Sequence, residues 1–249
     1  MKYEPLRMIY PYYNNPKMLE MQVENWNRYE GKFRDSIRII VIDDHSKSSP
    51  VPILEKCKAP VRCYRLKADY PWNMHQCRNI GAKEACKKEE NMWLFMSDID
   101  IILTPEMAYT MMDRELDPGK TYTMDRVFAP ELTEHKKHPN TFLVKHAAFW
   151  QVNGYDLDLT PIGGGGYGGD NQFMRQLFVV APEAYLPDDT LIGYGRRSRE
   201  GEPVIKDADT SDYDRVHWAE IYRKALERKK KTGDMRSLNP IRAAYERTL

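Results

Sequence analysis

The amino-acid sequence predicts one α/β domain with a central, mostly parallel sheet flanked by helices. Roughly the first 100 residues alternate short apolar runs with segments of helical periodicity, which is the signature of parallel βαβ units. The apolar runs are rich in β-branched residues, as expected for strands buried on both faces. With 249 residues, the chain is long enough for a single large domain.

The first half shows the clearest pattern of elements. Strands are expected at residues 6–10, 37–42, 61–66 and 92–96, and helices at residues 16–29 and 74–88. Polar clusters stand where three of these strands end, at residues 11–14, 43–46 and 97–100. Because ligands bind at the carboxyl ends of strands in open α/β sheets, we expect the functional site at that edge.

The second half is less regular. We expect strands at residues 121–127 and 141–145, a short helix at 147–152, and another helix at 171–178. Between these helices, residues 160–169 form a glycine-rich loop. A basic helix at 215–231 and a short helix that begins at Pro240 complete the prediction.

Two acids follow the fourth expected strand. Asp98 and Asp100 come directly after the apolar run 92–96, and unpaired charges next to a buried strand are costly. A divalent cation resolves this, because Mg²⁺ and Mn²⁺ prefer oxygen ligands and commonly share them with substrate phosphates. Such a metal would act as a Lewis acid on a departing diphosphate. The alternative is a turn with acidic caps.

The ends of the first two strands would lie side by side if those strands are neighbours. Tyr13 offers a flat surface on which a base can stack, and Asp44 can accept a hydrogen bond from a base N–H. Arg78, at the start of the helix 74–88, suits phosphate or ribose oxygens. Turn chemistry, helix capping and a solvated helix face are the alternative explanations for these residues.

Several classes of protein are disfavoured. We find neither an apolar run long enough to cross a bilayer nor a secretory signal after Met1, so we expect a cytoplasmic protein. The four cysteines form no CxxC pair, which disfavours a zinc knuckle and favours reduced thiols. The formal net charge of +1 gives no global indication of nucleic-acid binding.

The order of these motifs resembles the glycosyltransferase-A superfamily, close to its large family 2. The resemblance is carried by I-Y-P-Y-Y-N at 9–14, V-I-D-D-H-S at 41–46, R-N-I-G at 78–81 and S-D-I-D at 97–100. It implies that Asp44 contacts the base of a nucleotide sugar, and that Asp98 and Asp100 hold the metal and diphosphate. The predicted donor-binding residues are Pro11, Tyr13, Asp44, Arg78, Asp98 and Asn171.

The resemblance continues in the second half. Residues 149–156 (F-W-Q-V-N-G-Y-D) are similar to the segment that leads to the acceptor site. Residues 163–171 (G-G-G-G-Y-G-G-D-N) resemble the W-G-G-E-D or W-G-G-E-N element of galactosyl- and N-acetylgalactosaminyltransferases. Tyr167 replaces Trp and Asp170 replaces Glu. Asn171 stands where inverting relatives have the acid proposed as the base, and an amide cannot accept a proton at neutral pH.

These departures leave the stereochemistry open. If the reaction inverts, Asp170 is the expected base that deprotonates the acceptor hydroxyl. The glycine-rich run can act as a lid over the donor sugar or as a merely flexible loop. Trp150 and Tyr167 are candidates for a sugar-stacking wall, although core packing also explains Trp150.

Metal-dependent relatives often take a third protein ligand from a downstream histidine. His217 is the expected ligand here, ahead of His135, His138 and His146, and a packed or surface histidine is the alternative. The basic residues Arg196, Arg197, Arg199 and the stretch 223–231 favour a solvated surface. A polyanionic acceptor, such as DNA with hydroxylated bases or an anionic glycan, is the second interpretation.

We therefore predict one glycosyltransferase domain over residues 1–249. It comprises a nucleotide-sugar-binding half (1–103), an acceptor half (104–215) and a basic helical extension (216–249). With Mn²⁺ or Mg²⁺ it would transfer a sugar from a nucleoside-diphosphate donor, UDP-linked by resemblance, to a hydroxyl of a glycan or modified DNA base. The alternatives are a nucleotidyltransferase that makes nucleotide sugars and a noncatalytic sugar- or nucleic-acid-binding protein. A nucleotidyltransferase is disfavoured because no glycine-rich phosphate loop follows the first strand.

Overall fold

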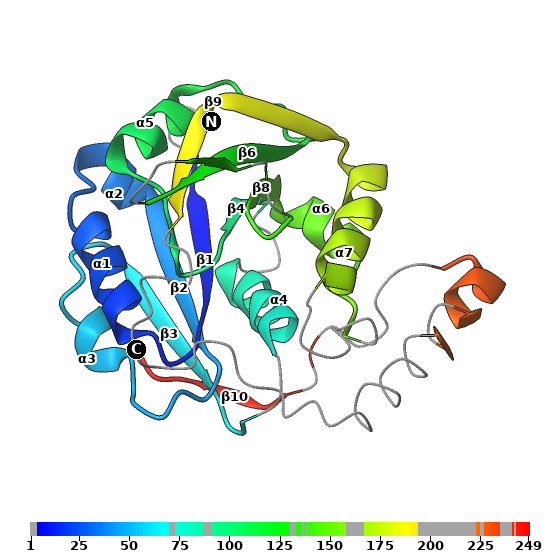
Figure 1. Cartoon of the computed structure of the whole chain (residues 1–249), viewed down its shortest axis with the longest axis horizontal. Coiled ribbons are helices and arrows are strands. Elements are labelled where there is room, and N and C mark those ends of the chain that lie inside the picture. Colours follow the sequence, from blue (N-terminus) through cyan, green and yellow to red (C-terminus); the bar gives the residue numbers. More distant parts are fainter. Residues whose placement is uncertain are drawn as a thin grey trace.

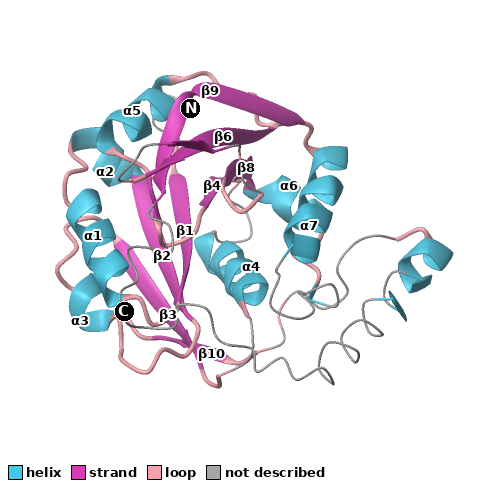
Figure 2. Ribbon diagram, viewed as in Figure 1, coloured by secondary structure: helices cyan, strands magenta, loops and turns pink. Residues whose placement is uncertain are grey.

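One sheet organises the molecule (Figures 1 and 2). The computed structural model describes residues 4–69, 73–86, 91–129, 133–135, 137, 139–157, 167–193, 223–224, 227–234, 241 and 243–249. Within these residues, ten strands form one sheet in the order β10-β3-β2-β1-β4-β8-β6-β9-β5, and β7 pairs with β6. No helix in the described part of the chain has the length and apolar character needed to cross a bilayer.

The first half is a parallel βαβ unit, as predicted. Strand β1 pairs in parallel with β2 and β4, and β2 pairs in parallel with β3. The strands are β1 (Leu6–Tyr12), β2 (Ile37–Asp43), β3 (Val61–Leu66) and β4 (Trp93–Met96). The helices are α1 (Pro16–Trp26), α2 (Gly31–Ser36), α3 (Val51–Leu54) and α4 (Met74–Ala85).

The second half makes the sheet mixed, so the expectation of a mostly parallel sheet holds only for the first half. Strand β8 is antiparallel to both β4 and β6, whereas β6 and β9 are parallel. The strands are β5 (Ile101–Ile102), β6 (Thr121–Phe128), β7 (Thr133–His135), β8 (Phe142–Lys145) and β9 (Glu183–Gly193). The helices are α5 (Pro105–Asp113), α6 (His146–Gln151) and α7 (Tyr167–Val180).

Two expectations for the second half need correction. The structure has a strand, β10 (Tyr245–Arg247), where we expected a helix after Pro240, because Tyr245 pairs with Leu66 at the open edge of β3. Residues 167–169 begin helix α7 and do not belong to the glycine-rich loop, and the rest of that loop, residues 160–166, lies outside the described residues. Of the expected basic helix, residues 223–224 and 227–232 are helical, and the remainder is likewise outside them.

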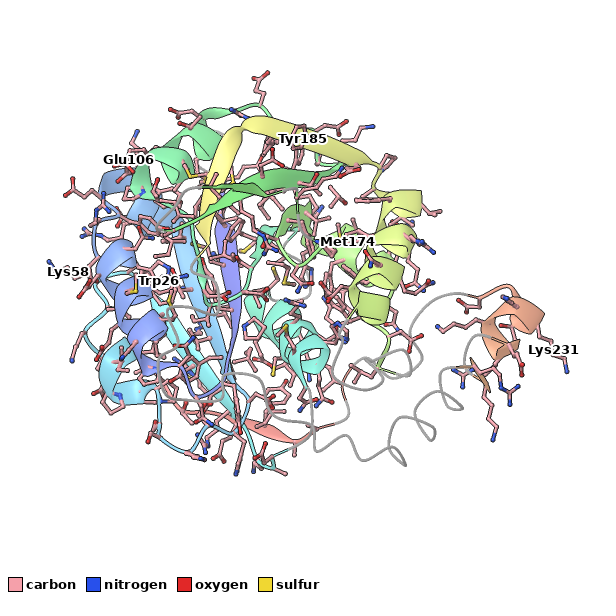
Figure 3. All side chains as sticks on the ribbon, viewed as in Figure 1. Trp26, Lys58, Glu106, Met174, Tyr185 and Lys231 are labelled. Carbon is pink, nitrogen blue, oxygen red and sulfur yellow. The ribbon has the colours of Figure 1, made fainter. Side chains whose placement is uncertain are left out.

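The sheet separates two apolar cores. Successive strand side chains point to opposite faces, so Met8 and Tyr10 belong to one core and Ile9 to the other. Helices α1, α2, α3 and α5 cover the first face, and α4, α6 and α7 cover the second (Figure 1). Figure 3 shows Trp26 and Met174 on these inner sides, whereas Glu106 and Lys231 lie at the periphery. Burial on both faces explains the nearly continuous apolar runs of β1 and β2.

Helix α4 packs unusually close to the sheet. A Cβ atom at Gly81 would lie 2.3 Å from Cγ2 of Ile9, so only glycine allows this approach. Because α4 connects β3 to the parallel strand β4, its first turn begins at the carboxyl edge of the sheet. The glycine of the R-N-I-G motif therefore brings His75 and Arg78 to the edge at which Asp98 follows β4.

Candidate active site

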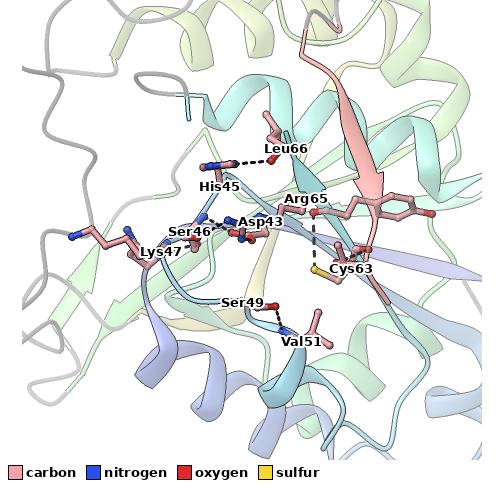
Figure 4. A network of polar contacts seen from close by, with 12 residues as sticks. Asp43, His45, Ser46, Lys47, Ser49, Val51, Cys63, Arg65 and Leu66 are labelled. Atoms are coloured by element: carbon pink, nitrogen blue, oxygen red, sulfur yellow. Dashed lines mark hydrogen bonds and ion pairs between the residues drawn. The ribbon is translucent and has the colours of Figure 1, made fainter. Parts of the chain in front are cut away.

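The turn after β2 is held by a buried carboxylate (Figure 4). The Asp43 side chain is fully buried, forms an ion pair with Arg65 of β3, and accepts a hydrogen bond of 2.9 Å from the Ser46 backbone N–H. Arg65 also donates through Nη2 to the Ser46 carbonyl, at 2.7 Å. One guanidinium thus fixes both the first and last residues of the turn. We call this set, together with Asn14, the base-side network.

The turn after β1 is tied to the same network. The Asn14 backbone N–H donates to Ser46 Oγ at 2.9 Å, and the Lys47 N–H donates to Asn14 Oδ1 at 2.8 Å. Asn14 and His45 adopt positive φ values of 41° and 60°, a region in which Asn and His are found more often than most other non-glycine residues. The two strand ends therefore lie side by side, as the sequence predicted.

The predicted base-binding residues lie on these turns. Asp44 is nearly buried, its backbone N–H donates to the Tyr12 carbonyl at 2.9 Å, and its Oδ1 accepts from Asn73 at 3.3 Å. Tyr13 is partly buried, and Pro11 is buried opposite Ile42. The pairing of β1 with β4 ends at Ile9, so these residues lie beyond the last paired residues of β4.

A second network joins the acids of the site, and we call it the acid network. The side chain of Arg78 is fully buried and forms ion pairs with Asp98 after β4 and with Asp170 in the first turn of α7. Its Nη1 lies 3.0 Å from Oδ1 of Asp170. A buried guanidinium thus holds together two carboxylates that are 72 positions apart in the sequence.

Two further side chains contact Asp170. His75, one turn before Arg78 on α4, places Nε2 at 2.9 Å from Oδ1 of Asp170. The amide nitrogen of Asn140 faces Asp98 at 3.4 Å in one orientation, and Asp170 at 2.7 and 2.8 Å in the other. The shorter pair favours the second orientation, because a carboxylate can only accept.

The turn at Gly154 and Tyr155, which precedes α7, packs against the α4 residues of this network. The Asn79 side chain donates to the Tyr155 carbonyl and accepts from the Tyr155 N–H, both at 2.8 Å. Gly154, at φ 68°, lies so close that an added Cβ would stand 2.6 Å from Asn79 Oδ1. The Tyr155 ring stacks on His75 and on Phe173, with centroids 4.9 and 3.9 Å apart. The N-I-G and N-G-Y sequences thus form one structural unit.

The charges at the site leave an acidic surplus. Burial lowers the pKa of Arg78, but the neighbouring Tyr155 and two carboxylates raise it by more, so it lies above its ordinary value. Burial lowers the pKa of Arg126 on β6, and the charges of Asp98 and Asp100 only partly offset this. Three carboxylates, those of Asp98, Asp100 and Asp170, face two guanidiniums, so these five groups sum to a formal charge of −1.

This arrangement fits a cation that is completed by substrate. In the part of the chain that the structure describes, no three His, Cys, Asp or Glu side chains form a group able to hold a metal ion. Mg²⁺ and Mn²⁺ are commonly held by one or two carboxylates together with substrate phosphates. Asp98 and Asp100 are two carboxylates of this kind, and their role as metal ligands stays a prediction. His217, the expected third ligand, lies outside the described residues.

The remaining predicted residues lie outside the two networks or outside the described part of the chain. Trp150 donates from its indole N–H to His146 at 2.9 Å and packs edge-on against Phe149, so both Trp150 and His146 have packing partners. Asn171 is exposed on α7. The side chains of His135, His138 and Tyr167 and the arginines at 196, 197 and 199 lie outside the described residues.

Sequence reasoning missed His75, Asn140, Arg65 and Arg126. For His75 a signal existed, because residues three apart share one face of a helix and Arg78 was already a candidate. Asn140, Arg65 and Arg126 carry no such signal, because their positions follow from the packing of distant strands.

Comparison with known proteins now decides the family. Residues 8–177 match the family model described as "Glycosyl transferase family 2". The chain belongs to this family. The match spans more than half of the chain and includes every residue of the base-side and acid networks described above. The protein is therefore a glycosyltransferase.

Solved structures support the same fold for this family 2 glycosyltransferase. Residues 1–349 of S. aureus TarS, in complex with UDP-GlcNAc, superpose with a TM-score of 0.64 at 15% identity, covering 91% of this chain and 73% of that one. The mannosyltransferase PcManGT from Pyrobaculum calidifontis, with GDP-Man and Mn²⁺, gives 0.56 at 12% identity, covering 96% and 78%. GalNAc-T7, with UDP, GalNAc and Mn²⁺, gives 0.56 at 12% identity, covering 92% and 50%. The search of curated proteins gave no match.

Proposed function

We propose that this glycosyltransferase is metal-dependent and transfers a sugar from a UDP-linked donor to an acceptor hydroxyl. The observation that carries the proposal is the pairing of buried Arg78 with both Asp98 and Asp170. This pairing joins the carboxylate expected at the diphosphate to the carboxylate expected at the reacting sugar. Such a connection is useful in a glycosyltransferase, because the departing diphosphate and the attacking hydroxyl lie on either side of the anomeric carbon in an inverting transfer and both must be positioned at once.

The donor would lie along the carboxyl edge of β1, β2 and β4. We assign Tyr13 and Asp44 to the base, and Asp98 and Asp100 to the metal and diphosphate. A bound Mn²⁺ or Mg²⁺ would supply Lewis-acid stabilisation of the departing diphosphate. Asn73 orients the Asp44 carboxylate through the hydrogen bond of 3.3 Å. Arg78, being fully buried, positions Asp98, and its own contact with the donor stays a prediction.

Asp170 is the residue we assign to the acceptor hydroxyl. In an inverting transfer, its carboxylate takes the hydroxyl proton while the acceptor oxygen forms a bond to the anomeric carbon. The bond from that carbon to the diphosphate oxygen breaks, and its electron pair leaves with the diphosphate. The first turn of α7 favours an anionic side chain at this position. The likeness of residues 163–171 to the W-G-G-E-D/N element is consistent with this role.

The identity of the donor needs a panel of nucleotides, because two of the similar structures hold UDP or a UDP-sugar and a third holds GDP-Man. The acceptor is a glycan or a DNA base that carries a hydroxyl. The exposed residues Arg223, Lys224, Arg228, Lys230 and Lys231 form a basic helical stretch that suits a polyanionic acceptor, whereas Lys229 is buried in an ion pair with Asp156.

The experiment is a donor screen with purified protein, Mn²⁺, and UDP- and GDP-sugars, in which release of nucleoside diphosphate is measured. We expect release from one donor, and we expect EDTA and the double variant Asp98→Ala/Asp100→Ala to abolish it. A full rate in EDTA would overturn the metal dependence. No release and no metal-dependent nucleotide binding by calorimetry would overturn the donor site itself.

A further inference from the structure

We propose that His75 is a positioning residue for Asp170. The inference rests on the function proposed above and deepens it by naming a group that sets the orientation of the base. His75 would act through its hydrogen bond to Asp170 and not by contacting the substrate, since only 1% of its surface is exposed.

The first observation is that three side chains hold the Asp170 carboxylate: Asn140, in the orientation favoured above, donates to Oδ1 at 2.7 Å and to Oδ2 at 2.8 Å, and two further side chains donate to Oδ1. Oδ1 accepts from His75 Nε2 at 2.9 Å and from Arg78 Nη1 at 3.0 Å. Arg78 is shared with Asp98, so a movement of Asp98 on nucleotide binding would be transmitted to Asp170 through Arg78. The hydrogen bond from His75 to the same oxygen fixes Asp170 without involving Asp98, so it does not depend on the nucleotide-binding part of the site.

The second observation is that the His75 ring is itself immobilised. It lies nearly parallel to the Tyr155 ring, at an interplanar angle of 12°. Tyr155 is in turn stacked against Phe173 of α7, and the Asn79 side chain forms hydrogen bonds with both its backbone N–H and its carbonyl. A carboxylate held by a clamped ring stays within the small range of geometry that general-base catalysis needs.

The third observation concerns the choice of residue type. The stacking on Tyr155 would be supplied equally by phenylalanine. A histidine in this position instead buries Nδ1, which has no hydrogen-bond partner among the described residues and is therefore costly. With Nε2 donating to a carboxylate, Nδ1 carries no proton in the neutral ring. The hydrogen bond to Asp170 is the feature that accounts for a histidine here.

The test separates stacking from hydrogen bonding with two substitutions. His75→Phe keeps a ring against Tyr155 and removes the hydrogen-bond donor to Asp170, whereas His75→Gln keeps an N–H near the position of Nε2 and removes the ring. The donor that the panel identifies is used with Mn²⁺, and kcat and KM for nucleoside-diphosphate release are measured. Calorimetry with UDP and Mn²⁺ measures donor-side binding separately.

We expect His75→Phe to lower kcat by about 10- to 100-fold with KM and UDP affinity within twofold of wild type. We expect His75→Gln to recover most of the loss. In the Asp170→Asn background, His75→Phe should cause no further loss, because the two residues act as one unit.

Three outcomes would overturn the inference. One is a wild-type kcat for His75→Phe. Another is equal impairment of both variants, which would indicate a packing role. The third is a full additional loss when His75→Phe is added to Asp170→Asn. If Asp170→Asn alone keeps wild-type kcat, the proposed base is wrong, and this result is distinct from a failure of His75 alone.

Discussion

The base-side network and the acid network differ in how they are assembled. The base-side network joins residues on neighbouring strand ends that are at most 33 positions apart. The acid network joins α4, β4 and α7, with the contact between His75 and Asp170 spanning 95 positions. The first follows from strand register alone, whereas the second exists only when both halves of the domain are packed together. We therefore expect damage to the acid network to affect stability and catalysis together.

The largest expected effect is that of Arg78→Met. It leaves Asp98 and Asp170 together without their cation, and removal of one partner from a buried ion pair typically costs about 3–5 kcal/mol. Urea unfolding measures the loss. As a control, Arg28→Met removes an exposed pair with Glu106 and should cost less than about 1 kcal/mol. Adding Asp170→Asn to Arg78→Met should restore part of the stability, and a further loss would contradict this account.

Gly154→Ala should damage the acid network through its support. The added Cβ would lie 2.6 Å from Asn79 Oδ1, and alanine would be strained at the φ of 68° that Gly154 adopts. We therefore expect the free energy of unfolding to fall by about 2–3 kcal/mol and kcat to be reduced. Gly31 is a matched control, because it also has a positive φ of 52° but no atom within 4 Å of the added Cβ. Gly31→Ala should cost about 1 kcal/mol from backbone strain alone. Equal losses in the two variants would show that the Asn79 contact is unimportant.

Arg65→Met tests the base-side network. It removes the partner of buried Asp43 and the donor to the Ser46 carbonyl, in a partly exposed position. We expect about 1–2 kcal/mol of destabilisation and a raised KM for the donor with little change in kcat. Steady-state kinetics with the identified donor measure both constants. A lowered kcat at unchanged KM would mean that the two networks are not functionally separate.

The smallest effect concerns pH and the α6 packing. Burial lowers the pKa of His146 below its ordinary value of 6.5, and its Nε2 accepts the Trp150 N–H. Because the unfolded chain takes up the proton first, stability is complete above about pH 6.5 and falls as the pH drops toward the folded pKa. We expect a loss below about 1.4 kcal/mol, the equivalent of one pKa unit. His146→Gln should unfold in urea with less change between pH 7.5 and 5.5, and an unchanged pH dependence would contradict the assignment.

The difference between the two networks explains which parts of the fold and of the site the sequence predicts. The strands of the first half and the D-D and D-x-D positions are predictable, because apolar periodicity and local polar clusters define them. Asp170 is a candidate only through the resemblance of residues 163–171 to the W-G-G-E-D/N element, and its role stays a prediction. Strand β10 was mistaken for a helix, because an edge strand of three residues depends on its partner β3 and not on its own pattern. Asn140 gains its position from packing across the domain, which no local signal encodes, whereas the three-residue spacing of His75 from Arg78 on one helix gives a local signal.

Metal binding in the presence of nucleotide tests the central claim most directly. Free Mn²⁺ would be followed by electron paramagnetic resonance while protein is titrated with and without UDP. We predict that UDP tightens Mn²⁺ binding, that Asp100→Asn weakens it by about 10-fold or more, and that Asp170→Asn leaves it within twofold while lowering kcat by about 100-fold or more. Wild-type Mn²⁺ binding by Asp100→Asn, or loss of Mn²⁺ binding in Asp170→Asn, would contradict the division of roles between the acids.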